Sequence, residues 1–489
     1  MSRTSGSAWA GLVQTYRSLP DVFFAELTPN RVRAPALKVL NRSLAQNLGL
    51  DPAALAAPEN LPVLAGNVFP EGLPAIAQAY AGHQFGGFTQ LGDGRALLLG
   101  ELVTPSGQVV DIQLKGSGPT PYARRGDGRA ALGPMLREYL ISEAMHGLGI
   151  PTTRSLAVVT TGEPVYRDSV LPGAVLTRVA ASHIRVGTFE FAATQGEEAL
   201  KALADYTIDR HYPELRDRTN PNPNTNTYLA FLNAVIDRQA ALIARWMAVG
   251  FIHGVMNTDN MSIAGETIDY GPCAFMDRYD PSTVFSSIDR QGRYAYANQP
   301  RIGHWNLSRL AEALLPLLND DEATALNLAQ NAIGEYPGLY QQYWHSALCQ
   351  KIGIASPSRQ AVSLAGDLLD LMWHSGADFT ATFTQLGNYT LMDPAFNEWL
   401  SRWHALIDTQ VGGMAAAQRL MQQVNPVVIP RNHLVQAALD EAEEEKGSFA
   451  PFEELLQAIQ TPFDARHQNT LYAQAPAADA KPYVTYCGT

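Results

Sequence analysis

Residues 252–273 read IHGVMNTDNMSIAGETIDYGPC, and they place several oxygen-bearing side chains around a short alternating segment. These side chains belong to Asn257, Asp259, Asn260 and Asp269. The alternation predicts two strand arms, 261–263 and 266–268, joined by the two-residue loop Ala264-Gly265, where glycine supplies the positive φ such turns need. In that register Asn260 lies directly opposite Asp269, with Cβ atoms about 5 Å apart.

The opposed pair Asn260 and Asp269 suits one hard divalent cation, because such ions prefer oxygen ligands and share them with nucleotide phosphates. Asp259 points to the other face of the segment, where it could meet an incoming hydroxyl. An Asx-rich surface turn would contain the same residue types, and this stretch alone does not separate the two interpretations.

The composition limits the class of protein. An apolar fraction of 46% with 17% charged residues is that of an ordinary globular chain. The net charge of −12 argues against a general nucleic-acid partner but leaves room for a local basic pocket. The three cysteines (Cys273, Cys349 and Cys487) are too few for a disulfide scaffold and lack zinc-site spacing. No h-region or apolar run of about 18 residues is present, so we expect no membrane partner and a cytoplasmic location.

Upstream, a glycine-rich stretch precedes a predicted hairpin. Residues 86–95 read GGFTQLGDGR, and the apolar run 96–103 and the alternating run 109–115 follow. Such a glycine-rich lip allows backbone to approach phosphates closely, although most glycine-rich turns are only turns. Lys115 ends the second strand, and a second glycine-rich stretch, 116–129, is the most basic part of this half.

A helix over 134–148 follows, started by Pro134 and ended by Gly149. It carries Glu138, and the order strand, lysine, helix, glutamate is that of a kinase-type Lys–Glu ion pair. The runs 155–160 and 174–179 predict further strands, after which Arg178 and Arg185 could help neutralise a triphosphate. For each of these charged residues, a solvated surface position is the alternative.

Outside this region the sequence predicts helices. Residues 1–80 show no regular pattern except for helical periodicity at 37–48. A long amphipathic helix is expected over 228–249, directly before the central segment. After Pro281 the apolar residues recur mainly with helical period. The expected helices are 307–318, 321–333, 359–372, 397–406 and 434–445.

Five features together resemble the SelO family of selenoprotein-O-like proteins, which have a protein-kinase-like fold. They are GGFTQLGDGR, Lys115, Glu138, HGVMNTDN and Asp269-Tyr-Gly. The resemblance is dense from Tyr80 to Asp280 and continues to the C-terminal cysteine. It implies an α+β, two-lobed fold, with an N-terminal extension over 1–80, a smaller β-rich N-lobe over 81–180 and a larger helical C-lobe with a tail over 181–489.

The family resemblance also implies an activity, the transfer of AMP from ATP to Ser, Thr or Tyr hydroxyls of proteins, with UTP as a possible co-substrate and Mg²⁺ or Mn²⁺ as cofactor. It implies that Lys115 binds phosphates, that Glu138 orients it and that Asp259 accepts the proton. Asn260 and Asp269 would hold the metal. The remaining residues of the nucleotide site would be Gly92, Gly94, Arg95, Asp127, Gly128, Arg178 and Arg185.

One departure from ordinary kinases concerns the base. Their catalytic loop places it five residues before the metal-binding asparagine, and that position here is Val255. The resemblance implies that ATP binds in reversed orientation, so that the α-phosphate faces the acceptor. A non-catalytic pseudokinase scaffold and a conventional protein kinase are the two alternatives.

The last expectation concerns two cysteines. Cys273 lies four residues after Asp269, and Cys487 stands near the C-terminus. The family resemblance implies a reversible disulfide between them that ties the tail to the activation segment, whereas two inert free thiols are the alternative in a reducing compartment. We expect the protein to act as a monomer.

Overall fold

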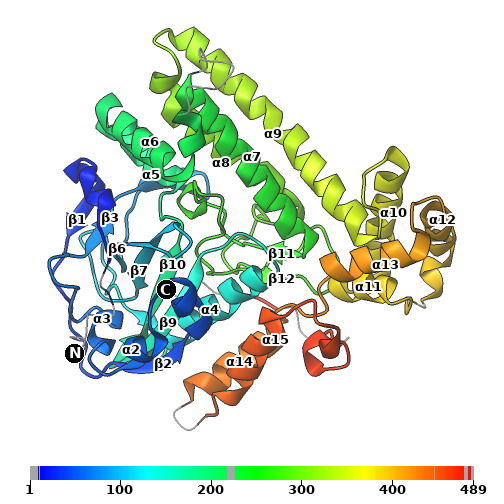
Figure 1. Ribbon diagram of the computed structural model, residues 1–489, viewed down its shortest axis with the longest axis horizontal. Coiled ribbons are helices and arrows are strands. Elements are labelled where there is room, and N and C mark those ends of the chain that lie inside the picture. The colour runs from blue at the N-terminus through cyan, green and yellow to red at the C-terminus, as the bar shows by residue number, and fades with distance from the viewer. Residues whose placement is uncertain are drawn as a thin grey trace.

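The computed structural model (Figure 1) describes residues 9, 11–216, 226–391, 393–444, 447–477 and 483–485. It is a mixed α/β structure in which a large antiparallel sheet is accompanied by many helices. Within the described residues, no helix combines the length and the apolar character needed to cross a membrane.

The main sheet has eight strands. Seven follow the spatial order β1-β3-β6-β7-β10-β9-β2, and β8 pairs with β10 beside them. The bounds are β1 Phe24–Glu26, β2 Ala36–Leu40, β3 Ile76–Gln78, β6 Ala96–Val103, β7 Val109–Lys115, β8 Ala130–Ala131, β9 Arg154–Tyr166 and β10 Val170–Ala180. The expected hairpin is confirmed as β6 and β7, with Lys115 paired to Ala96. A separate small sheet joins β4 (Ala81–Gln84) to β5 (Gly87–Gln90).

The first 80 residues supply three of these strands. The expected helix over 37–48 is wrong in its first half, which is strand β2, and right in its second half, which is helix α1 (Arg42–Asn47). β2 pairs with the edge of β9, and the Asn41 side chain accepts the Leu44 N–H at 3.0 Å, as an N-cap does. The available sheet edge therefore overrides the local helical periodicity.

Helix α4 (Leu132–Gly147) packs against β9 and β10, and α14 and α15 cover its outer side. The long helices α7, α8 and α9 pack together, and Figure 1 shows α10 to α13 gathered at the far end of α9. Every helix expected after residue 225 is present, most of them longer than expected. The bounds are α2 Pro52–Ala56, α3 Leu61–Leu64, α5 Val186–Gln195, α6 Glu197–His211, α7 Thr227–Ala248, α8 Gln299–Leu318, α9 Glu322–Lys351, α10 Arg359–Ser375, α11 Phe379–Gly387, α12 Asn397–Ile407, α13 Gly413–Val424, α14 Asn432–Glu443 and α15 Ala450–Gln460.

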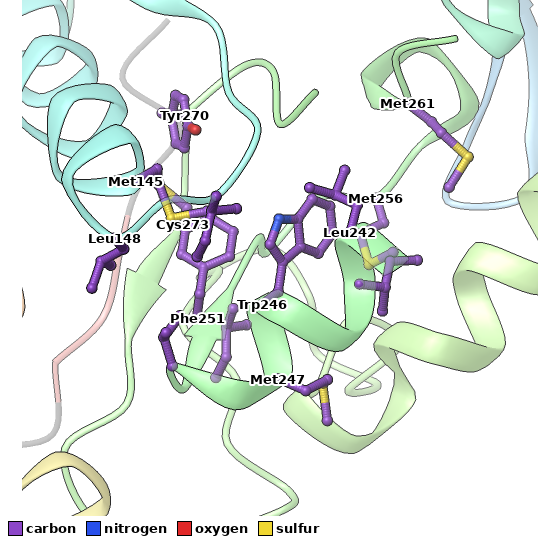
Figure 2. Close-up of a cluster of buried hydrophobic side chains, with 14 of the residues drawn as sticks. Met145, Leu148, Leu242, Trp246, Met247, Phe251, Met256, Met261, Tyr270 and Cys273 are labelled. Atoms are coloured by element: carbon purple, nitrogen blue, oxygen red, sulfur yellow. The ribbon is translucent and has the colours of Figure 1, made fainter. Parts of the chain in front are cut away.

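An apolar cluster lies behind the central segment 252–273. Figure 2 shows side chains from α4, from α7 and from this segment in one buried group. Trp246 of α7 donates its indole N–H to the Thr267 hydroxyl at 2.8 Å, and the Phe251 ring packs edge-on against Phe275. The short strands β11 (Phe251–Ile252) and β12 (Ala274–Phe275) close the segment at its base. The core thus fixes both ends of the segment.

The expected hairpin within the central segment is wrong. The arm 261–263 pairs with residues 184–186, through Val186 N–H to Met261 O at 2.9 Å and Ile263 N–H to Ile184 O at 3.0 Å. The arm 266–268 pairs instead with residues 151–153. Gly265 does have the expected positive φ, +77°. Because distant segments satisfy the backbone of both arms, Asn260 and Asp269 are not cross-strand neighbours.

Candidate active site

A cleft of about 850 Å³ opens between the main sheet, the β4–β5 hairpin and the central segment. Most of the expected site residues line it: Gly92, Gly94, Arg95, Lys115, Asp127, Gly128, Arg178, Arg185, Asp259, Asn260 and Asp269. Glu138 is absent from this wall and lies behind Lys115, and Cys273 is also outside the wall. Residues distributed over more than 170 positions of the chain therefore meet in one cavity.

The expected Lys–Glu ion pair is present at the back of the cleft. Lys115 Nζ lies 2.6 Å from Glu138 Oε2, and both side chains are buried. Arg178 binds the other oxygen of the same glutamate, with Nε at 2.8 Å and Nη2 at 2.6 Å from Oε1. Burial by itself would raise the pKa of Glu138, but the positive charges of Arg178 and Lys115 have the larger effect. The pKa of Glu138 is therefore lower than its usual value. Glu138 thus orients two cations, where the sequence predicted one.

Asp269 is surrounded by cations. Its Oδ1 accepts hydrogen bonds from Arg178 Nη2 at 2.6 Å and Lys115 Nζ at 3.2 Å, and Arg185 Nη2 lies 3.5 Å from Oδ2. Burial favours the neutral acid, yet Arg178, Lys115 and Arg185 hold the pKa of Asp269 well below its usual value. The backbone is left-handed there (φ +63°), a conformation that aspartate tolerates better than most residues.

Asp93 is a site residue that the sequence reasoning did not identify. Its Oδ1 lies 3.5 Å from Arg185 Nη1, and the Arg185 guanidinium sits 4.3 Å from the centroid of the Tyr80 ring. The Asp93 Oδ2 accepts hydrogen bonds from the Gln78 N–H and the Gln113 amide. The available signal was its place between two expected site residues, in the middle of the glycine-rich stretch.

The cleft is cationic although the chain is acidic. Seven cations line it against four carboxylates, Asp93, Asp127, Asp259 and Asp269. The cations are Arg95, Lys115, Arg125, Arg129, Arg167, Arg178 and Arg185. The basic stretch 116–129 signalled part of this set, but Arg125, Arg129 and Arg167 were not assigned to the site. A local excess of positive charge in a chain of net charge −12 favours binding of a polyanion such as a nucleoside triphosphate.

Two of the site glycines are required by close packing. A Cβ at Gly92 would collide with the Tyr122 side chain, and a Cβ at Gly128 would collide with the Gly118–Pro119 backbone. Both also have positive φ, +141° and +66°. Gly92 therefore lets the basic loop 116–129 lie directly on the 91–95 segment, and Gly128 lets the two ends of that loop approach each other.

Asp259 differs from the other cleft carboxylates. It lies in the 3₁₀ turn Thr258–Asn260 and is 7% exposed, and among the described residues its Oδ1 has no hydrogen-bond partner. Its Oδ2 receives one long hydrogen bond, 3.4 Å from Gln84 Nε2. Burial raises the pKa of Asp259 to about 6. Such a carboxylate is ionised at neutral pH and is poised to accept a proton.

Glycine also makes room for this carboxylate. A Cβ at Gly82 would lie 2.5 Å from Asp259 Oδ1, and a Cβ at Gly187 would collide with the Ala81 carbonyl, 3.2 Å from the Asp259 Cα. Strand β4, the start of α5 and the 3₁₀ turn therefore approach closely enough to bury Asp259, and among the described residues no cation lies within ion-pair distance of it.

Asn260 and Asp269 both face the cleft, and they offer a metal two oxygen donors. The Asn260 Nδ2 donates to the Val255 carbonyl at 3.0 Å, which leaves the amide oxygen for a ligand. In the part of the chain that the structure describes, no cluster of three or more His, Cys, Asp or Glu could hold a metal. A hard cation held by this pair would take its other ligands from phosphate and water. The pair does not fit an all-protein metal site.

Cys273 is fully buried beneath the cleft, and burial raises the pKa of its thiol to about 11. Its carbonyl accepts a hydrogen bond from Arg137 Nη2 at 2.5 Å. Cys487 lies outside the described residues, so the disulfide between the two cysteines stays a prediction. The described part of the tail does reach this region, because the Thr485 hydroxyl donates to the Pro272 carbonyl at 2.7 Å.

One family model and several known proteins are similar to this chain. A family model described as "Protein adenylyltransferase SelO" matches residues 11–460. A protein of Halalkalibacterium halodurans is 58% identical over 97% of this chain and 96% of its own length. A protein of Methylorubrum populi is 55% identical over 97% of this chain and 98% of its own, and one of Bacillus mycoides is 53% identical over the whole of both. Each of the three relatives is named "Protein nucleotidyltransferase YdiU".

Proposed function

The chain belongs to the SelO family and is a protein nucleotidyltransferase, and on this premise we propose that its cleft transfers AMP from ATP to hydroxyl side chains of proteins. The acceptors are Ser, Thr or Tyr residues, and pyrophosphate is the second product. The proposal depends on one observation about Asp259. Among the described residues it is the one cleft carboxylate without an ion-pair partner, and its pKa is raised to about 6.

In the proposed step Asp259 takes the proton of the acceptor hydroxyl. The hydroxyl oxygen forms a bond to the α-phosphorus, and the bond from that phosphorus to the oxygen bridging the β-phosphate breaks. The electron pair leaves with pyrophosphate. A base with a pKa near 6 is largely ionised at neutral pH and retains enough basicity to assist proton removal.

The cations on the opposite wall would bind the nucleotide. Lys115 and Arg178 share Glu138 and Asp269, so both are held in place before the triphosphate arrives. Preorganised charges of this kind stabilise negative charge without the cost of reorganisation. Asn260 and Asp269 would hold Mg²⁺ or Mn²⁺, which would neutralise the charge that develops on the phosphates.

We further propose a protein-kinase-like arrangement of two lobes with ATP in the reversed orientation. Val255 lines the cleft and stands five residues before Asn260, the spacing at which a kinase catalytic loop carries its base, and valine cannot accept a proton. Arg167 lies against the basic loop, since it pairs with Asp127 and donates to the Arg129 carbonyl, and these arginines would receive the terminal phosphates. Both observations support a cleft that presents the α-phosphate to the acceptor.

Incubation with ATP labelled at either the α- or the γ-phosphate tests the proposal, with the label that enters protein as the readout. We expect α-label in the protein itself or in added proteins, and loss of most of this signal in Asp259→Asn. Incorporation of γ-label alone would show a conventional kinase, and binding of ATP without any incorporation would show a scaffold. α-Labelled UTP in a parallel reaction tells AMP transfer from UMP transfer.

A further inference from the structure

The turn of the β4–β5 hairpin has a conformation that its sequence disfavours. Phe85 and Gly86 form the two-residue turn, and both have positive φ, +50° and +89°. Turns with two positive φ values favour Asn, Asp or Gly at the first position. A left-handed phenylalanine costs about 1–2 kcal/mol relative to the right-handed region. Strained residues of this kind persist where the surrounding structure holds them, and they gather at functional sites.

Contacts with the catalytic segment hold the turn in place. The Phe85 N–H donates to Asn257 Oδ1 at 3.1 Å, and the Tyr294 hydroxyl donates to the same oxygen at 2.6 Å. The Phe85 ring packs edge-on against the Tyr294 ring, with centroids 5.2 Å apart. Asn257, two residues before the proposed base, therefore fixes the position of Phe85.

Phe85 nevertheless remains 40% exposed, and it lines the cleft together with Ile288, which is 54% exposed. Single exposed apolar side chains are common on proteins and need no explanation. These two side chains are different because both belong to the wall of the catalytic cleft, and one is held there by a strained backbone.

The hairpin also touches the proposed base. Gln84, which precedes Phe85, donates to Asp259 Oδ2, and Gly82 packs directly against the same carboxylate. A hydroxyl that gives its proton to Asp259 must therefore approach beside this turn. Among the described residues, no cation lies within ion-pair distance of Asp259. The guanidinium of Arg185, the cleft cation whose charge acts on Asp259, is engaged by Asp93, Asp269 and the Tyr80 ring. The space beside Asp259 would therefore receive the acceptor hydroxyl, while the paired cations would bind the nucleotide.

We propose that Phe85 and Ile288 form an acceptor subsite that binds an apolar side chain of the protein substrate next to the modified hydroxyl. This inference rests on the proposed function and names the chemistry of the acceptor segment. An extended polypeptide is the occupant that fits, because it carries a hydroxyl to Asp259 and an adjacent side chain to the rim. Burying one apolar group in such a subsite is worth about 10-fold or more in kcat/KM.

The test uses two synthetic serine peptides that differ only beside the acceptor, one with leucine on both sides and one with asparagine. Wild-type protein is expected to transfer α-label to the leucine peptide about 10-fold more efficiently, as kcat/KM. Phe85→Gly, which keeps the positive φ but removes the ring, and Ile288→Gln should each reduce this ratio several-fold. Leu326→Gln is the matched control, since Leu326 is similarly exposed (46%) but lies on α9 outside the cleft wall.

An equal preference for the two peptides in wild-type protein would overturn the subsite, as would a ratio that both cleft variants retain. Transfer to whole proteins but to neither peptide would also overturn it, because an extended segment would then be insufficient. Loss of only the concentration-dependent modification of one copy by another in Ile288→Gln would point to a second copy of this chain as the occupant. The absence of α-label from every acceptor, the protein itself included, would overturn the proposed function instead.

Discussion

Two aspartates on opposite walls of the cleft have pKa values shifted in opposite directions. On one wall Asp269 lies among Lys115, Arg178 and Arg185, and on the other Asp259 lies against glycine and Gln84. Asp259 is buried and Asp269 is half-buried, and the loss of water around each would by itself raise both pKa values. The cations reverse the effect for Asp269, whose pKa falls well below normal, whereas the pKa of Asp259 stays raised at about 6.

The difference shows how one short segment can supply two chemical roles. A carboxylate that is ionised at every working pH suits a metal and phosphate partner, and one that titrates near 6 suits proton transfer. Because both residues are aspartates, the difference between their roles must come from the side chains that surround them. The predictions that follow test whether the two walls act separately.

The largest effect is expected for Asp269→Ala. Removing this carboxylate leaves three buried cations without their shared anion and takes one proposed metal ligand away. We expect AMP transfer to fall by about 10³-fold or more, since a bound metal ion contributes several kcal/mol of transition-state charge stabilisation. Calorimetry should show that metal-dependent ATP binding is lost as well. Asp269→Asn, which keeps the shape, should behave in the same way, and activity within 10-fold of wild type would contradict the assignment.

Asp259→Asn should greatly reduce the rate of AMP transfer and leave nucleotide binding nearly unchanged. We expect transfer of α-label to fall by about 10²–10⁴-fold, the usual contribution of a general base. The dissociation constant for ATP should change little, because no cation contacts this carboxylate within ion-pair distance in the described part of the chain. If this variant lost ATP binding as fully as Asp269→Ala, the two walls would not be separate.

The same variant should be more stable than the wild type at neutral pH. The pKa of Asp259 is raised on folding, so its protonated form is favoured in the native state, and this stabilisation is lost as pH rises through about 6. Asparagine avoids the buried charge and should raise the free energy of unfolding by about 1–3 kcal/mol above pH 6. The gain should shrink toward pH 4. Urea unfolding of both proteins at the two pH values measures this gain. An equal or lower stability of the variant at neutral pH would argue against a raised pKa of Asp259 in the folded protein.

The smallest effect is expected for Gly82→Ala. The added methyl group would lie 2.5 Å from Asp259 Oδ1 and must displace the carboxylate. We expect transfer activity to fall by about 10-fold, because small displacements of a catalytic group cost up to about 10²-fold. Gly87→Ala on the partner strand is the control, since its nearest contact is the Gln84 carbonyl at 3.6 Å. Equal activity of the two variants would show that the position of Asp259 tolerates movement.

Much of the fold could be predicted because local patterns carry it. The β6–β7 hairpin, helix α4 and the long helices after residue 225 follow from alternation, helical period and capping residues. The failures involve long-range pairing. Residues 37–40 pair with the edge of β9, and the arms of the central segment pair with 184–186 and 151–153. Strand partners depend on distant segments, which no local window contains.

The candidate site shows the same division. The resemblance to the SelO family placed Lys115, Asp259, Asn260 and Asp269 together, and the structure brings all four to one cleft. It did not identify Asp93 or Arg167, whose membership depends on the segments that fold against them. The disulfide expected between Cys273 and Cys487 stays a prediction.

The sequence by itself determined which chemical groups this protein has, their order along the chain and the family to which it belongs. Only the tertiary structure decided that Glu138 serves two cations, that Phe85 stands at the mouth of the cleft, and that Asp259 and Asp269 have pKa values shifted in opposite directions. The physical reason is that a pKa and a contact depend on burial and on charges within a few ångströms, and in this cleft those neighbours come from distant parts of the chain.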